Sequence, residues 1–462
     1  MRKPTLRPYQ LDYYNTVLSD FVSLQNLLMV LPTGGGKTTI FGQLTEHWYN
    51  NNKRVLLIVH RVELVDQVVE TVQRFNLKCG IIASGYPRDY GQPIQVGMIQ
   101  SLPDHLPSGF DYIVIDECHH CVAGSYTKLW QAFPKAKKLG VTATPIRTDR
   151  KGFDDHFDKM IDLVSLPWLI KHGYLVKPKH YFCSNLGNVS IHNGEYDFTE
   201  MSKIMREQRH IADVIESYQR YVPGKRAVVF AVDVNHSKIL AERFNEKGIT
   251  AEHIDGEMPK EIRKAAVNRF KAGKTLVLCN FNIVSEGFDV PAIEAVILAK
   301  RSKSLAWYLQ SIGRALRTDP NGKKKYGYVL DCASAYLDHG FAGIGYQWTL
   351  DADRDVLLES ITKTNQFNRS NSGEIESVVP TEELIGVEMI AFSEEYDIRC
   401  ANIEMCIEKA RQGEEHLSEA ILHYNDILTL EGKQWTEVEI NYAQKRTGFS
   451  LREIHGLIGA VA

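Results

Sequence analysis

Short apolar runs alternate with longer helical stretches through the first 330 residues of the chain. The runs of the first series are Leu27–Leu31, Val55–Val59, Ile94–Met98 and Tyr112–Ile115. Those of the second series are Ala227–Val232, Thr275–Cys279, Ala295–Leu298 and Tyr328–Leu330. Such alternation is typical of βαβ units that build parallel sheets. Because the stretch near Ser165–Pro178 separates the two series, we predict two α/β domains in tandem, residues 1–168 and 169–345.

The stretch Lys260–Ala272 is a representative helical connection. Its apolar side chains recur at helical spacing and Gly273 follows as a stop signal. The apolar positions are Ile262, Ala265, Ala266, Val267 and Phe270. We expect them to form one apolar face.

Residues 346–462 have a different character. No βαβ pattern continues there, and helical patterns dominate at Glu414–Leu428 and Thr436–Lys445. The stretch Ser370–Ile398 contains eight acids and no Lys or Arg. We therefore predict a small, mainly helical accessory domain. Because its acidic segment would repel phosphates, we expect that segment to contact a protein partner, its own core or water.

The composition is that of an ordinary soluble globular protein, with 44% hydrophobic and 24% charged residues. No apolar run approaches the ~18 residues that span a bilayer. The first residues, MRKPTLRPYQ, lack the apolar core of a secretory signal. Eight scattered cysteines show no disulfide spacing, which favours a reducing, cytoplasmic compartment.

A glycine-rich segment follows the apolar run Leu27–Leu31 and precedes a helical stretch that starts at Thr39. Its residues are Pro32, Thr33, Gly34, Gly35, Gly36, Lys37 and Thr38. Glycines let backbone N–H groups approach phosphate oxygens, Lys37 can reach the β- and γ-phosphates, and the Thr38 hydroxyl can ligate Mg²⁺. The strict pattern has Gly where Leu31 stands. The alternative is a glycine-rich turn with a surface lysine.

Two acids, Asp116 and Glu117, end the apolar run that begins at Tyr112. At the carboxyl end of a strand, Asp116 can hold Mg²⁺ and Glu117 can orient the attacking water. The alternative is a strand end with solvated acids. Cys118 and Cys121, with His119 and His120 between them, also permit a zinc site. Since a structural zinc site needs four ligands and no second pair lies nearby, we expect the histidines to couple this site to the neighbouring strand instead.

With these motifs, residues 5–345 resemble a superfamily 2 helicase of the DECH-box type. Six further blocks match in order: Leu6–Gln10, Val59–Gln67 with Val96–Leu102, Val141–Pro145, Ala227–Val232 with Asn235 and His236, Ser285–Pro291, and Gln310–Arg317. The resemblance implies two RecA-like domains with parallel sheets. Its DECHH form favours DNA-directed members, such as RecG-like and XPB-like repair motors, restriction-enzyme motor subunits and the phage UvsW type of branch-migration helicase.

The resemblance also implies roles for individual residues. Beyond Thr33–Thr38, it implies nucleotide contacts for Arg7, Gln10, Gly287 and Asp289, with Gln10 reading the adenine. It implies nucleic-acid contacts for Arg61, Gln100, Ser101 and Asn235. Phe281 stands where the family usually has a threonine that contacts nucleic acid, so we expect Asn280 or Asn282 to replace it.

Gln310, Arg314 and Arg317 are spaced i, i+4 and i+7, which places them on one face of a helix. This helix belongs to the domain that lacks a phosphate loop. An arginine supplied to a γ-phosphate from elsewhere raises the hydrolysis rate by about 10³–10⁵. We therefore predict that these three residues, with Lys37 and Glu117, are catalytic. The alternative is a solvated basic helix face.

The sequence thus predicts an ATP- and Mg²⁺-dependent DNA helicase or translocase that remodels forks and junctions in repair, recombination or replication. With a net charge of −3, any grip on nucleic acid must be local and largely sequence-independent. Candidate basic stretches are Lys135–Lys138, Arg147–Lys151, Lys300–Lys303 and Lys323–Lys325. Alternatives are an RNA helicase, a nucleotide-gated clamp and the motor subunit of a restriction or defence complex. We expect it in the cytoplasm, or in the host cytoplasm if it is phage-encoded, with nucleoid association as a further option.

Overall fold

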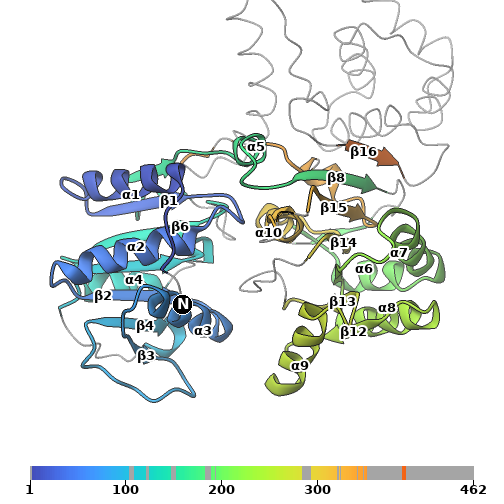
Figure 1. The fold of residues 1–462 in the computed structure, drawn as a ribbon, viewed down its shortest axis with the longest axis horizontal. Helices are drawn as coiled ribbons and strands as arrows, with labels where there is room; N and C mark the ends of the chain where they lie inside the picture. The colour runs from blue at the N-terminus through green and yellow to red at the C-terminus, as the bar shows by residue number, and fades with distance from the viewer. Residues whose placement is uncertain are drawn as a thin grey trace, which may run out of the picture. The chain divides into compact units, whose positions relative to one another are not determined.

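The computed structural model describes residues 3–102, 109–120, 124–146, 152–182, 189–192, 194–283, 293–319, 322, 324–340, 342–346, 348–350 and 388–391. The chain divides into two compact units, and its first crossing from one to the other lies between Leu175 and Val176 (Figure 1). The predicted boundary after residue 168 falls inside the short helix Leu166–Lys171. Within the described residues, none of the helices combines the length and the apolar character needed to cross a bilayer.

The first unit is built on a seven-stranded sheet in the order β3-β4-β2-β5-β6-β1-β7. The strands are β1 (Asn26–Val30), β2 (Val55–Val59), β3 (Gly80–Ile82), β4 (Ile94–Met98), β5 (Tyr112–Asp116), β6 (Lys137–Thr142) and β7 (Lys159–Asp162), and every pair is parallel. The helices are α1 (Pro8–Asp20), α2 (Lys37–Asn50), α3 (Val62–Arg74), α4 (Gly124–Ala132) and α5 (Leu166–Lys171), with short 3₁₀ turns η1 (Ile99–Ser101) and η2 (Cys118–His120). All five residues of β2 are buried, as expected for a parallel strand covered on both faces.

The second unit has a seven-stranded sheet in the order β12-β13-β11-β14-β15-β8-β16. Its strands are β8 (Lys177–Phe182), β11 (Ala227–Ala231), β12 (Ala251–Ile254), β13 (Val277–Asn280), β14 (Ala295–Ala299), β15 (Tyr326–Asp331) and β16 (Glu388–Ala391). The helices are α6 (Phe198–Met205), α7 (Gln208–Tyr221), α8 (Val234–Glu246), α9 (Lys260–Lys271), α10 (Leu305–Leu316) and α11 (Tyr336–His339); a small hairpin pairs β9 (Ile191–His192) with β10 (Glu195–Tyr196). The prediction of two parallel-sheet α/β domains is therefore confirmed.

Two sequence expectations about the second unit need correction. The apolar face of α9 is only partly buried: Ala266 and Phe270 lie in the core, whereas Ile262 is 52% exposed. The helix packs on β12, the edge strand of the sheet, so the helix has no further strand on that side against which to bury its apolar face. Beyond residue 345, Glu388–Ala391 forms a strand that pairs in parallel with β8, so this segment of the predicted, mainly helical domain is part of the second sheet instead. The helices predicted at Glu414–Leu428 and Thr436–Lys445 lie outside the described residues.

Candidate functional site

The glycine-rich loop joins β1 to α2 and leaves the amino end of that helix open. Gly36 is the N-cap residue with a left-handed φ of 87°, and no side chain of the described residues caps the helix. Gly34 also has a positive φ, of 88°. Leu31 is fully buried, and a Cβ placed on Gly35 would lie 2.7 Å from its Cγ. Glycine at position 35 therefore accommodates the leucine that replaces the first glycine of the strict pattern.

The loop fits a phosphate group on three independent counts. An uncapped helix N-terminus combines unsatisfied N–H groups with the positive end of the helix dipole. Lys37 and Thr38 start α2 and therefore lie at that end. The Thr33 hydroxyl is buried and has no hydrogen-bond partner among the described residues, so an incoming oxygen would satisfy it. The residues of the loop are thus suited to hold the phosphates of a nucleotide.

Helix α1 holds this loop from one side. The Tyr9 hydroxyl and the Gln10 amide nitrogen both donate to the Gly35 carbonyl, at 2.7 and 2.9 Å. The Gln10 amide oxygen accepts from the Arg7 backbone N–H at 2.9 Å. Both ends of the Gln10 amide therefore contact protein groups in this structure, and its expected contact with adenine stays a prediction. The Arg7 guanidinium lies 5.2 Å from the centre of the Tyr174 ring.

Lys37 and Glu117 meet at the carboxyl ends of β1 and β5. The Lys37 Nζ lies 3.1 Å from Glu117 Oε1, and the two side chains are only 11% and 15% exposed. Glu117 has a φ of 48°, a left-handed conformation that costs a non-glycine residue free energy and is often found at functional sites. Its backbone N–H donates to Asp116 Oδ1 at 3.0 Å. The structure thus brings together the lysine and the two acids that the sequence singles out.

A chain of polar contacts continues from Glu117 to the neighbouring strand. His119 is buried, with its Nδ1 3.4 Å from Glu117 Oε2 and 2.9 Å from the Thr142 hydroxyl. That hydroxyl donates to the Thr144 carbonyl and accepts from the Thr144 N–H, both at 3.1 Å. The expected link between the histidines and the next strand is present as this contact between the ends of β5 and β6. Cys121, required for the zinc alternative, lies outside the described residues.

The expected nucleic-acid residues of the first unit lie near the ends of β2 and β4. Arg61 is the N-cap residue of α3, a helix that no side chain in the described part of the chain caps. The Gln100 amide donates to the His60 carbonyl at 3.3 Å, which joins the two strand ends. Ser101 lies in η1, and its side chain lies outside the description. These positions are at the same sheet edge as Lys37 and Glu117.

In the second unit, two of the expected nucleic-acid residues are exposed and one is not. Asn235 on α8 and Asn282, whose φ is 56°, are exposed. Asn280 is fully buried, and its amide donates to the Val229 carbonyl at 2.8 Å. The expectation that Asn280 contacts nucleic acid is therefore wrong, because its amide holds two strands of the sheet together.

The predicted arginine helix is α10. Gln310 and Arg314 lie on it and are 3% and 5% exposed. Arg317 is its C-cap residue, with an extended backbone, so the expectation of one continuous helical face holds only as far as Arg314. Gly287 and Asp289, expected to contact the nucleotide, lie outside the described residues.

Several lysines of the predicted basic stretches are wholly or partly buried, whereas Lys135 and Lys325 are exposed. Lys138 is 2% exposed and donates to the carbonyls of Phe133 and Ala136. Lys324 donates to the carbonyls of Ile293 and Arg317, and burial lowers its pKa to about 7. Burial also lowers the pKa of Lys300, to about 8. Residues 147–151 and 323 lie outside the described residues. Lys138 and Lys324 were expected on a phosphate-binding surface; their ammonium groups instead donate to backbone carbonyls inside the fold.

Arg301 and Lys303, which belong to the predicted basic stretch Lys300–Lys303, both pair with the carboxylate of Asp338. The Arg301 Nε and the Lys303 Nζ each lie 2.6 Å from an oxygen of Asp338, which is 2% exposed. The Tyr196 hydroxyl donates to the same carboxylate at 2.9 Å. The two cations are thus neutralised within the second unit and fix the segment that precedes α10.

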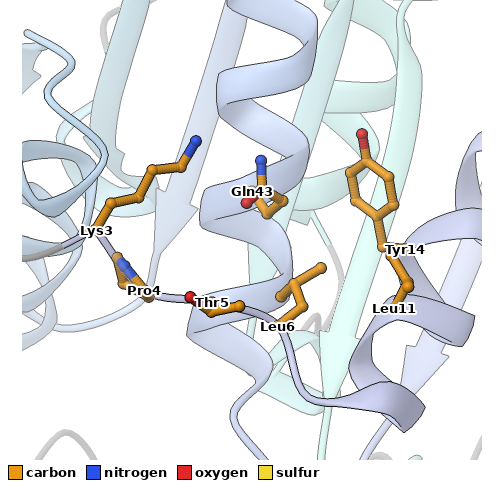
Figure 2. Close-up of a pocket in the computed structure, with 7 residues that line it drawn as sticks. All are labelled: Lys3, Pro4, Thr5, Leu6, Leu11, Tyr14 and Gln43. Carbon is orange, nitrogen blue, oxygen red and sulfur yellow. The ribbon is translucent and has the colours of Figure 1, made fainter.

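Sequence reasoning missed the aromatic residues around the loop. Tyr9, Trp168 and Tyr174 pack together, although nothing in the local pattern connects residues so far apart. The motif block Leu6–Gln10 contained the only available signal, a tyrosine beside Gln10. An apolar pocket of about 460 Å³ also borders this block, between the N-terminal segment and helices α1 and α2 (Figure 2). It is lined by Lys3, Pro4, Thr5, Leu6, Leu11, Tyr14 and Gln43.

Two family models match the chain in the expected order. The model described as type III restriction enzyme, res subunit, matches residues 3–147. The model described as helicase conserved C-terminal domain matches residues 209–319. The first match falls in the first unit, and most of the second match falls in the second unit.

Three relatives illustrate the similarity. A 51.5 kDa protein of a Lactococcus phage (isolate 7-9) is 30% identical over 319 residues, which are 69% of this chain and 68% of that protein. IRC3 of Saccharomyces cerevisiae, named as an ATP-dependent helicase, is 27% identical over 359 residues, 72% of this chain and 52% of IRC3. XPB2 of Sulfurisphaera tokodaii, named as a DNA 3'-5' translocase, is 24% identical over 353 residues, 66% of this chain and 78% of XPB2. The chain therefore spans only about half the length of IRC3.

Solved structures share the fold at lower identity. LlaBIII, an ATP-dependent type ISP restriction-modification enzyme bound to DNA, has a TM-score of 0.56 at 15% identity, covering 95% of this chain and 36% of LlaBIII. Dbp5 of S. cerevisiae, bound to RNA and ADP BeF₃, has a TM-score of 0.50 at 14% identity, covering 84% of this chain and 94% of Dbp5. From its family matches, its relatives and its fold, the chain belongs to the superfamily 2 helicases, which are nucleic-acid-dependent ATPases.

Proposed function

We propose that the protein is an ATP-dependent DNA helicase or translocase that remodels branched DNA, such as forks and junctions, in repair, recombination or replication. The observation that carries this proposal is the edge of the first sheet, where the open amino end of α2, Lys37 and Glu117 meet. An uncapped helix end with an adjacent lysine can hold a triphosphate, and an acid beside it can orient water.

In this proposal the chain's own groups take distinct parts in hydrolysis. Lys37 moves from the Glu117 carboxylate to the β- and γ-phosphates, because a phosphate is the more strongly charged partner. The released Glu117 orients the attacking water. Thr38 and Asp116 would hold Mg²⁺, which supplies charge neutralisation to the phosphates when bound. The base lies beside Arg7 and Gln10, next to the apolar pocket of Figure 2, whose walls suit an aromatic ring.

The contacts beyond Glu117 connect the site of hydrolysis to the neighbouring strand. When Lys37 leaves Glu117, the balance of charge around His119 changes. His119 is hydrogen-bonded to Thr142, and Thr142 to Thr144. Directional hydrogen bonds therefore pass a shift of the carboxylate to the end of β6. This region is the block Val141–Pro145, and the resemblance to superfamily 2 helicases implies that this block links hydrolysis to domain movement.

We further propose that Arg314 and Arg317, with Gln310, complete the site from the second unit when nucleotide is bound. Arg314→Ala and Arg317→Ala should each retain nucleotide binding and lose turnover by about 10³-fold or more, the range for a lost arginine finger. Turnover and binding of a fluorescent ATP analogue are measured separately. Wild-type turnover in both variants would exclude this arrangement.

DNA is the proposed substrate because XPB2 is named as a DNA translocase and LlaBIII is bound to DNA. The fold of RNA-bound Dbp5 supports an RNA helicase as the second candidate. Contacts to the phosphate backbone, at Arg61, Gln100, Ser101, Asn235 and Asn282, would be largely sequence-independent and sensitive to salt. We place the protein in the cytoplasm, or in the host cytoplasm of a phage, with any protein partner on residues 346–462.

The test is a panel of ATPase and strand-displacement assays on single-stranded DNA, forks, Holliday junctions and RNA hybrids. We expect forks or junctions to stimulate hydrolysis and to be unwound. Lys37→Ala is the control and should lower turnover by about 10²–10³-fold, as the loss of one charged transition-state contact does. Stimulation by RNA alone would replace DNA by RNA as the substrate. Stimulated hydrolysis without strand displacement would indicate a nucleotide-gated clamp.

A further inference from the structure

Helix α1 carries two buried tyrosines that face the same side, and each of them bonds the backbone near the phosphate loop. Tyr9 and Tyr13 are spaced i, i+4 and are 2% and 0% exposed. The Tyr9 hydroxyl donates to the Gly35 carbonyl at 2.7 Å. The Tyr13 hydroxyl donates to the Val30 carbonyl, at the end of β1, also at 2.7 Å. Burial raises the pKa of both hydroxyls, so both remain protonated donors.

The same two tyrosines also contact the segment that leads out of the first unit. The Tyr13 oxygen accepts from the backbone N–H groups of Leu163 and Val164, at 2.9 and 3.3 Å. The Tyr9 ring meets the rings of Tyr174 and Trp168 edge to face, with centroids 4.7 and 5.8 Å apart. Such pairs have a preferred geometry and resist displacement.

The contacted segment leads into the first covalent connection between the two units. It runs through α5 and a tight turn in which Gly173 has a φ of 71° and the Tyr174 N–H donates to the Leu169 carbonyl at 2.9 Å. The residue after Tyr174 is the last of the first unit before the chain enters the second. Trp168 and Tyr174 therefore flank a rigid turn at the start of the crossing.

We propose that Tyr9 and Tyr13, with Trp168 and Tyr174, form a relay that makes the position of the connection between the units depend on whether the phosphate loop holds nucleotide. The inference rests on the proposed function for its nucleotide. A phosphate bound by the loop changes the position of the Gly35 carbonyl, and a 2.7 Å hydrogen bond requires the Tyr9 hydroxyl to follow. Tyr9 then shifts against the rings of Trp168 and Tyr174, which belong to the connection. These aromatic residues are positioning residues and take no part in the chemistry.

Coupling between two sites has a typical magnitude that can be measured. Two sites joined through one bistable element typically change each other's equilibrium by about 5–150-fold. The relay therefore predicts that cutting it lowers the stimulation of ATP hydrolysis by nucleic acid within that range. Basal hydrolysis, which depends on the loop itself, should change little when only the connection side of the relay is altered.

The first experiment uses the full chain and alters Trp168, which lies on the connection side of the relay. Trp168→Leu removes the aromatic partner of Tyr9, whereas Trp168→Phe keeps one. We expect Trp168→Leu to retain basal hydrolysis and binding of a fluorescent ATP analogue but to lose about 5–150-fold of the nucleic-acid stimulation. Trp168→Phe should retain the stimulation. Equal stimulation in Trp168→Leu and wild type would overturn the relay, as would equal loss in both variants.

A second experiment reads the relay directly and needs no hydrolysis. Trp168 stacks on His172 at 3.9 Å, so its emission should respond to a shift of the connection. Because the chain has six tryptophans, the fluorescence of Trp168 is obtained by subtracting the emission of Trp168→Phe from that of the wild type. We expect a non-hydrolysable ATP analogue with Mg²⁺ to change the fluorescence of Trp168. We expect the Tyr9→Phe variant to lose most of that change, even at a saturating concentration of the analogue.

The matched control is Tyr218→Phe in the second unit. Tyr218 is equally buried and its hydroxyl also donates to a backbone carbonyl, that of Lys225, at 2.8 Å. It should keep the full Trp168 response. An undiminished response in Tyr9→Phe, or no response in the wild type while analogue binding is seen, would overturn the relay. A wild-type protein that responds to nucleotide yet shows no stimulation by nucleic acid would contradict the proposed function and leave the relay supported.

Discussion

The two sheets have the same strand pattern but differ at the helix ends that follow matching strands. Read along the two orders, β1 matches β8 and β2 matches β11. In the first unit the helices after β1 and β2 begin at Gly36 and Arg61, and no described side chain caps either helix. In the second unit the helices after β8 and β11 begin at Asp197 and Asp233, whose carboxylates accept from the backbone N–H of Glu200 and His236.

In the proposed function, this difference explains why the nucleotide binds to the first unit. An aspartate at the N-cap satisfies the free N–H groups and neutralises the positive end of the helix dipole. In the proposed function, the helix end at Gly36 binds the phosphates of a nucleotide, and the helix end at Arg61 lies where the backbone of a nucleic acid binds. Two copies of one fold can thus have different functions because of a few residues at the strand ends.

Filling the open amino end of α2 should have the largest effect on the difference between the two units. A Cβ at Gly36 would lie 2.3 Å from the Gln10 amide nitrogen, at a residue whose φ is +87°. We expect Gly36→Ala to weaken ATP binding by about tenfold or more, equivalent to about 1.4 kcal/mol or more, because the alanine displaces Gln10 and the loop. Binding of a fluorescent analogue and the hydrolysis rate are the measurements.

Gly85→Ala separates this effect from simple backbone strain. Gly85 has a φ of +84° with no atom within 4 Å of the added Cβ. Both substitutions should lower the free energy of unfolding by about 1–2 kcal/mol, the cost of a left-handed non-glycine residue. Only Gly36→Ala should affect ATP. If Gly36→Ala bound ATP as tightly as Gly85→Ala does, the open amino end of α2 would not be the phosphate site.

The accuracy of the sequence analysis differed between these regions for physical reasons. Val55–Val59 was predicted to the residue, since a strand buried on both faces appears as an unbroken apolar run. The juxtaposition of Lys37 with Glu117 followed from parallel strands, whose carboxyl ends share one edge. The roles of the candidate residues in binding and catalysis stay predictions.

The failures have a common cause, which is that a sequence pattern does not reveal the partners of a polar group. Lys138, Lys324 and Asn280 were placed at a nucleic-acid surface, yet each donates to backbone carbonyls inside the fold. A long lysine side chain can satisfy its charge in this way only when tertiary structure brings carbonyls to it. The contact of Tyr9 with Trp168 is equally non-local, so no periodicity could have indicated it.

A smaller effect should follow from opening the capped end in the second unit. Asp233 caps α8 and also lies 3.0 Å from the Arg206 guanidinium. We expect Asp233→Ala to lower the free energy of unfolding by about 1–3 kcal/mol, from the lost cap and the lost hydrogen bonds. Urea unfolding measures this, and binding of ATP should not change.

Glu246→Ala, at the other end of the same helix, is the control. Glu246 pairs with Arg243 at 2.7 Å, but both side chains are more than half exposed, so its loss should change stability by no more than about 0.5 kcal/mol. A variant of Asp233 that kept its stability and lost ATP affinity would contradict the division of labour between the two units.

The smallest expected effect is a pH dependence that belongs to the capped end alone. His236, in the first turn of α8, accepts from the Val232 N–H through Nδ1. Burial lowers its pKa to about 4, with Asp233 opposing and Arg206 and His210 reinforcing the shift. The folded protein therefore binds this proton less readily than the unfolded chain, in which histidine has a pKa of about 6.5. Its contribution to stability is complete above pH 6.5 and is lost as the pH falls towards 4. Between pH 7.5 and 5.5 the loss of stability is about 1.3 kcal/mol.

Urea unfolding of wild type and His236→Asn at both pH values isolates the contribution of His236, because the asparagine oxygen can still accept from the Val232 N–H. The wild type should lose more stability than the variant by that amount. Parallel losses in the two proteins would show that His236 titrates alike in the folded and unfolded chain, and that the capped end is more open to water than its contacts indicate.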